Sequence, residues 1–204
     1  SPDGSQIVFD AREADGRPNI WIINVKSGDT KKLLSDPGPN FHPAWSPDGS
    51  KIVFASLRSG NADIWLVPVD GGTPVQITDN PDAEHHPQWS PDSKSIIFTS
   101  IQGEDADICI VPAVGGPVKK LVAGPSFDDC AYFSHDGSMI VYKSRREGNS
   151  ELWIARSDGS QPRHLSTPGN IGWPNWSPDG NWLAFTLDLN DNRDIWIMKV
   201  ERGE

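Results

Sequence analysis

Short apolar runs recur along the chain at nearly equal intervals. Each run consists of three aliphatic or aromatic residues, too few for a helix and typical of a strand. Nine or ten residues after each run, an acidic or amide residue begins a second run, as in Asp63-Ile64-Trp65. The first runs are Ile7–Phe9, Ile52–Phe54, Ile96–Phe98, Ile140–Tyr142 and Leu183–Phe185. The pattern predicts pairs of adjacent strands and no helix.

A tight turn precedes each first run, and Trp45-Ser46-Pro47-Asp48-Gly49 is its fullest copy. Proline presets φ, the aspartate accepts hydrogen bonds from nearby backbone N–H groups, and glycine takes a positive φ. The turn serines are Ser1, Ser46, Ser90, Ser134 and Ser177, a period of 45, 44, 44 and 43 residues. This period fits four short strands in each blade of a β-propeller. A catalytic residue is rarely needed five times, so we interpret the turn aspartates as structural.

The sequence therefore predicts an all-β propeller of four-stranded blades in a single domain, residues 1–204. About four and a half repeats are present, starting near residues 1, 46, 90, 134 and 177. The first repeat lacks its first strand and the last repeat lacks its fourth. We expect either part of a six-bladed ring, with a sixth blade's worth of chain absent, or an open five-repeat form. In the open form, exposed blade edges would pair two copies into a homo-oligomer.

Charge and cysteine content narrow the classes of partner. The net charge is −10, and lysine and arginine gather only in pairs, so we expect no nucleic-acid binding. The absence of a run of eighteen apolar residues predicts no membrane-spanning helix. We interpret Cys109 and Cys130 as free thiols, because two cysteines make no disulfide framework.

The recurring block, followed at fixed distance by Asp-Ile-Trp and a Gly-Gly turn, resembles the repeat of TolB-type β-propellers over the whole chain. Ser93, Cys109, Phe133 and His135 depart from the pattern without changing its spacing. The resemblance implies a six-bladed, periplasmic or extracellular platform for a protein or peptide partner, such as an envelope lipoprotein. Similar repeats also form the propeller domain of prolyl-oligopeptidase-like hydrolases, which gates substrate to a separate catalytic domain. Sensor domains that bind a small ligand or metal are the third class.

In a β-propeller the first strand of each blade lines a central channel, and the loops before these strands meet at one mouth of it. Polar residues gather at this place in the sequence, just before the aromatic residue that ends each first strand. Imidazole and carboxylate suit a metal or polar ligand there, although solvated loop residues explain the same pattern. We predict a partner-binding face without a catalytic residue, cofactor or metal ion. Its predicted residues are His42, Glu84, His85, His86, Asp128, Asp129 and Trp173, with Arg58, Arg145 and Arg146 from loops between second and third strands.

Overall fold

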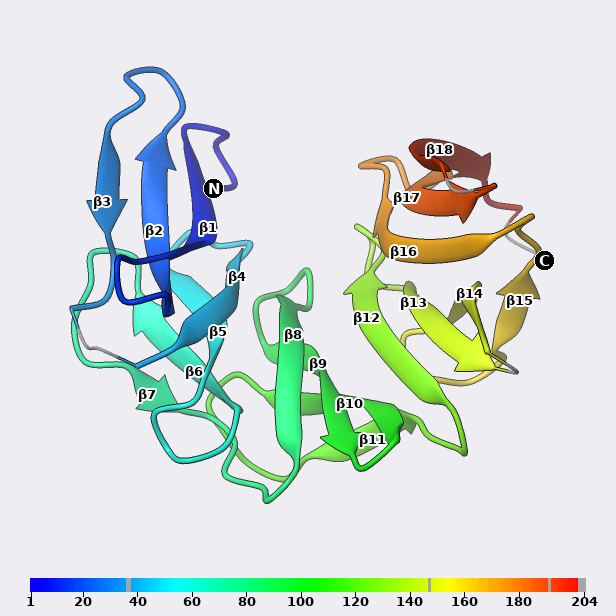
Figure 1. Ribbon diagram of the computed structural model, residues 1–204, viewed down its shortest axis with the longest axis horizontal. Helices are drawn as coiled ribbons and strands as arrows, with labels where there is room; N and C mark the ends of the chain where they lie inside the picture. The colour runs from blue at the N-terminus through cyan, green and yellow to red at the C-terminus, as the bar shows by residue number, and fades with distance from the viewer. Residues whose placement is uncertain (36–37, 147, 191, 202–204) are drawn as a thin grey trace. The chain divides into compact units, whose positions relative to one another are not determined.

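A computed structural model describes residues 1–35, 38–146, 148–190 and 192–201. The described residues form eighteen strands and no helix, which confirms the predicted all-β fold class (Figure 1). Within these ranges, no helix is long and apolar enough to cross a membrane. The chain divides into two compact units, Ser1–Ile96 with Ile110–Lys119, and Ile97–Cys109 with Lys120–Glu204.

The first unit contains the strands of repeats one and two and the first strand of repeat three. The strands are β1 (Gln6–Arg12), β2 (Pro18–Asn24), β3 (Thr30–Lys32), β4 (Asn40–Trp45), β5 (Lys51–Ser56), β6 (Asp63–Pro68), β7 (Val75–Gln76) and β8 (Ala83–Trp89). They pair antiparallel in the orders β1-β2-β3 and β4-β5-β6-β7. The described strands of the first repeat are therefore β1, β2 and β3.

Three strands of repeat three cross the division between the units: β9 (Ser95–Gln102), β10 (Asp105–Pro112) and β11 (Lys119–Val122). The rest of the second unit consists of β12 (Phe127–Phe133), β13 (Met139–Arg146), β14 (Asn149–Arg156), β15 (Arg163–Leu165), β16 (Asn170–Trp176), β17 (Trp182–Leu189) and β18 (Asn192–Lys199). Here β12 to β15 pair antiparallel in chain order, and so do β16 to β18.

Each unit buries the apolar runs between consecutive repeats. Ile52, Val53 and Phe54 of β5 are all fully buried. Successive strand residues face opposite sides, so both faces of this sheet are covered. An indole also links neighbouring repeats, because Trp89 Nε1 donates to the carbonyl of Ala44 at 3.2 Å and Trp176 Nε1 to that of Tyr132 at 3.2 Å.

The repeated turn is closed by its own side chains. In repeat two the Gly49 N–H donates to the Ser46 carbonyl, and Ser46 Oγ donates to Asp48 Oδ1 at 2.7 Å. Ser50 donates to the same carboxylate from both its N–H and its hydroxyl. The hydrogen bonds from Ser46 and Ser50 lower the pKa of Asp48 to about 2. The turn aspartate is thus a structural acceptor.

Candidate functional site

The first strands of four repeats share a backbone irregularity that the sequence did not reveal. His42, His86, Cys130 and Trp173 stand at equivalent positions, and each adopts a left-handed conformation, with φ of 53°, 50°, 54° and 49°. The strand register shifts at three of these positions, between Phe41 and Ala44, Asp129 and Tyr132, and Gly172 and Asn175. These are β-bulges, which commonly redirect side chains next to functional sites. We call the four residues the bulge positions.

The bulges bring neighbouring side chains together. Consecutive residues of a regular strand point to opposite faces. Here the rings of Phe41 and His42 have centroids only 5.0 Å apart, and those of His85 and His86 only 6.2 Å apart. A left-handed residue within each strand therefore lets two adjacent side chains share one side.

The result in the first unit is a histidine cluster of Phe41, His42, His85 and His86. His42 and His86 lie 4.0 Å apart with planes tilted by 33°, and His42 and His85 lie 5.9 Å apart. Phe41 stacks on His85 at 5.4 Å. All four rings are partly exposed. The predicted residues His42, His85 and His86 thus come together from β4 and β8.

Glu84, the neighbour of this cluster in sequence, faces the interior. Its side chain is fully buried and accepts hydrogen bonds from Thr78 Oγ1 and Asn80 Nδ2. Burial raises the pKa of Glu84 to about 7, although both hydrogen bonds act in the opposite direction. In this conformation Glu84 supports β8 and is closed to a partner.

The predicted acids of the second unit are also buried. Asp129 accepts hydrogen bonds from Thr99 Oγ1 at 2.9 Å and the Cys130 N–H at 2.6 Å, and pairs with Lys143 at 3.2 Å. Asp128 accepts from Ser126 Oγ at 2.9 Å, and burial raises its pKa. Both carboxylates hold β12 within its own unit.

The two bulge positions of the second unit differ in exposure. Cys130 is buried, and desolvation raises the pKa of its thiol, so it remains protonated and unreactive. Both cysteines of the chain are buried, and neither forms a disulfide bond. Trp173, by contrast, exposes 53% of its surface. It is the predicted second-unit residue best placed for an apolar contact.

The three predicted arginines stack on aromatic rings. Arg58 lies 4.7 Å from the Trp65 ring and Arg146 lies 4.0 Å from the Trp153 ring. Each also donates from Nε to the serine two residues earlier. Arg145 lies 4.9 Å from Phe127. The loop assignment was wrong for Arg145 and Arg146, because β13 continues to Arg146, which pairs with Asn149.

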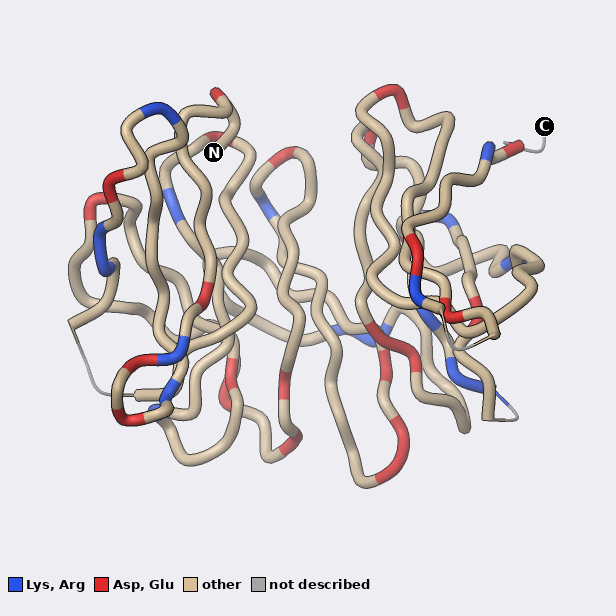
Figure 2. The backbone as a smooth tube through the Cα atoms, turned by 45° about the horizontal axis from the view of Figure 1, so that its top comes forward, with Lys and Arg blue, Asp and Glu red and all other residues tan. Residues whose placement is uncertain are grey.

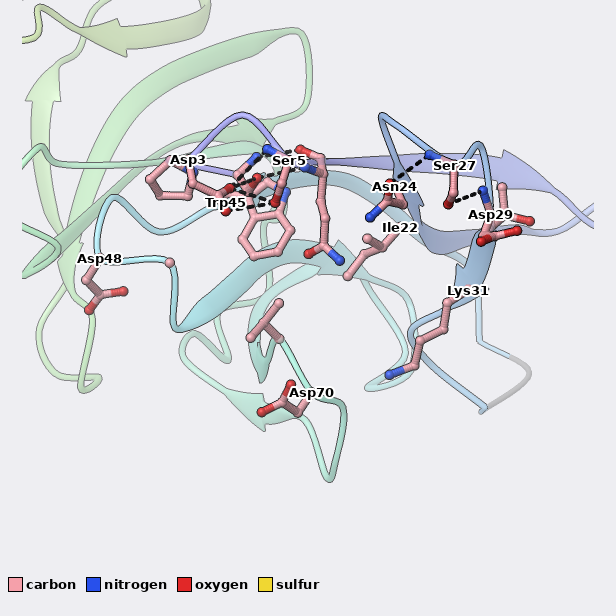
Figure 3. Close-up of a pocket in the computed structure, with 16 residues that line it drawn as sticks. Asp3, Ser5, Ile22, Asn24, Ser27, Asp29, Lys31, Trp45, Asp48 and Asp70 are labelled. Atoms are coloured by element: carbon pink, nitrogen blue, oxygen red, sulfur yellow. Dashed lines mark hydrogen bonds between the residues drawn. The ribbon is translucent and has the colours of Figure 1, made fainter.

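A separate recess of about 640 Å³ lies in the first unit (Figure 3). Its walls come from repeats one and two and include Asp3, Lys31, Trp45, Asp48 and Asp70. Two of its acids, Asp3 and Asp48, belong to the repeated turns and already accept hydrogen bonds from serine residues. Sequence reasoning did not indicate this recess, because only folding brings the turn of the first repeat beside Trp45 of the second.

Charged residues are distributed over many elements. Figure 2 shows acidic and basic residues scattered along the backbone of the described residues. Acidic residues number 28 and basic ones 18, which accounts for the net charge of −10. Three of the five histidines of the chain lie in the histidine cluster.

Comparison with known proteins identifies the repeat. The family model described as the TolB beta propeller domain matches residues 1–165. The chain belongs to the TolB β-propeller family. A solved structure described as putative TolB from Agrobacterium tumefaciens is similar over the whole of this chain and 76% of its own, with 26% identity and a TM-score of 0.86.

A curated relative of this TolB-type chain is the Tol-Pal system protein TolB of Alcanivorax borkumensis, 40% identical over 60 residues. The match spans 29% of this chain and only 14% of that relative. A puromycin hydrolase mutant is also similar over 98% of this chain and 35% of its own, with a TM-score of 0.77. At 15% identity, that similarity shows the fold alone.

Proposed function

We propose that this TolB-type propeller is a non-catalytic interaction module that binds a protein or peptide partner. The observation that carries the proposal is Trp173, a large aromatic side chain that exposes 53% of its surface on a bulged strand. Exposed aromatic residues on rigid elements are typical anchors of protein interfaces. A preformed strand also orders little on binding, which lowers the entropic cost.

The burial of three predicted residues narrows the contact surface. Glu84, Asp128 and Asp129 are buried and support their strands. Within the second unit, the proposed contact residues are therefore Trp173, Arg145 and Arg146. The similarity to a Tol-Pal system protein supports an envelope protein, such as a lipoprotein, as the partner and a periplasmic location.

The test replaces Trp173 with asparagine, which tolerates the left-handed backbone. The purified peptidoglycan-associated lipoprotein of the source organism is immobilised on a surface and titrated with the chain. The same titration is made on proteins captured from the envelope of that organism. Losing an interface anchor costs about 2 kcal/mol or more, so the affinity should fall at least about thirtyfold.

Trp182→Asn is the matched control, because Trp182 exposes 40% of its surface but stands at the start of β17, outside the bulge positions. It should bind like the parent chain. Equal partner affinity of the Trp173 variant and the parent chain would remove Trp173 from the interface.

A further inference from the structure

The histidine cluster combines three imidazoles from two strands of one unit. The ring centroids lie 4.0 Å apart for His42 and His86, 5.9 Å for His42 and His85, and 6.2 Å for His85 and His86. We propose that His42, His85 and His86 bind one divalent transition-metal ion, of the Zn²⁺ or Co²⁺ type, through imidazole nitrogens. This site is independent of the proposed partner surface around Trp173.

The rings lie close to the spacing that a shared ion requires. Three imidazoles around one tetrahedral ion, with metal–nitrogen distances of about 2.0–2.1 Å, have ring centroids about 5 Å apart. The three observed distances lie on both sides of this value. His42 and His86 are now partly stacked, so binding turns these two rings until one nitrogen of each faces the ion.

The backbone explains why the imidazoles converge. His85 and His86 are consecutive, and in a regular strand their rings would lie on opposite faces. The left-handed conformations of His42 and His86 are unfavourable for residues with a Cβ atom. The repeat imposes the same conformation on Cys130 and Trp173, so the bulge brings adjacent side chains to one side whichever residue occupies it.

The surroundings suit a cation reached from solvent. All three histidines are partly exposed, and Phe41 stacks on His85 with planes 27° apart, which fixes the orientation of that ring. The carboxylate of Asp10 accepts a hydrogen bond from the His42 N–H at 3.1 Å and so places negative charge nearby. Neutral imidazoles prefer zinc, cobalt, nickel and copper to magnesium and calcium.

Titration of the metal-free full chain tests the site. Co²⁺ binding is followed by visible absorption and Zn²⁺ binding by calorimetry. We expect one ion per chain, with absorption bands typical of tetrahedral Co²⁺, and weaker binding as the pH falls, because protons compete for the imidazoles.

The decisive variant is the triple substitution His42→Asn, His85→Asn and His86→Asn. Asparagine tolerates the left-handed backbone, so the bulges can persist without imidazoles. The triple variant should lose binding. Each single variant should bind at least about tenfold more weakly, because loss of an outer-shell residue alone costs that much.

The two remaining histidines provide the control. His135→Asn and His164→Asn should bind the ion like the parent chain, because neither residue belongs to the cluster; His164 stacks on Trp153. Two results would overturn the proposal. One is a folded triple variant, judged by circular dichroism, that keeps the parent's affinity and stoichiometry. The other is a folded parent chain that binds neither ion.

Discussion

At the scale of single residues, the carboxyl group of Glu84 is fully buried. It lies in β8, the strand that also carries two of the clustered histidines. Its neighbours Thr78 and Asn80 donate hydrogen bonds, but these do not offset the loss of hydration. The folded protein therefore holds a proton on Glu84 at pH values where the unfolded chain has released it.

Stability should accordingly fall as the pH rises. The pKa of Glu84 is 4.5 in the unfolded chain and about 7 in the fold. The stabilisation is fully present below pH 4.5 and is lost as the pH rises through 7, a change of about 3 kcal/mol. Urea unfolding of the parent chain between pH 4.5 and 7.5 measures this slope.

Glu84→Gln should flatten that pH dependence, since the amide does not titrate, whatever its effect on absolute stability. Asp63 and Asp128, whose pKa values burial also raises, should leave a smaller residual slope. Identical slopes for the variant and the parent chain would show that Glu84 is already ionised at neutral pH.

The alignment of repeats indicated which histidines lie close together, but not the backbone conformation or the burial around them. Repeat alignment placed His42 and His86 at one equivalent position, and the structure brings them within 4.0 Å. The alignment did not reveal the left-handed backbone, because His, Cys and Trp do not mark a positive φ in a sequence as glycine does. The burial of Glu84 depends on Thr78 and Asn80, which no spacing rule connects to it.

At the scale of elements, strands and turns follow directly from the local sequence. Pro, Asp and Gly each have a local physical role, so the turn after Trp45 could be read without tertiary information. Strand ends were less predictable. Arg145 and Arg146 looked like loop residues, but antiparallel pairing of β13 with β14 carries the hairpin to Asn149.

Replacing the turn aspartate should lower the stability of the protein. Asp48→Ala removes the acceptor for the Ser46 hydroxyl and for the Ser50 N–H and hydroxyl. We expect a loss of about 1–2 kcal/mol in the free energy of unfolding, measured by urea titration at pH 7.

Acid should reproduce part of that effect in the parent chain. The pKa of Asp48 is lowered from 3.8 to about 2, so its stabilisation is present above pH 3.8 and lost as the pH falls through 2. The Asp48→Ala variant should therefore lose less stability than the parent over this range. A variant with the parent's stability at pH 7 would show that the turn does not need the carboxylate.

At the scale of the whole molecule, stability depends on contacts between neighbouring repeats. The indole N–H groups of Trp89 and Trp176 each donate to the preceding repeat. The equivalent Trp45 Nε1 is buried and has no hydrogen-bond acceptor among the described residues.

This difference gives a matched set of variants. Trp89→Phe and Trp176→Phe lose an indole and a hydrogen bond, whereas Trp45→Phe loses only the indole. The first two should be less stable than Trp45→Phe by about 1 kcal/mol, measured as the free energy of unfolding. Equal losses at all three positions would mean that the inter-repeat hydrogen bonds contribute nothing.

The bulge positions have a consequence for how such a chain could change its specificity. His42, His86, Cys130 and Trp173 carry three different kinds of side chain on nearly the same backbone conformation. The backbone at these points is set by the repeat, so it tolerates chemically different occupants. A library randomised at 42, 86 and 173, with the buried position 130 held constant, would therefore vary recognition while preserving the frame. Substitutions at these positions during evolution would likewise change what the chain binds, one residue at a time, without changing the fold of a blade.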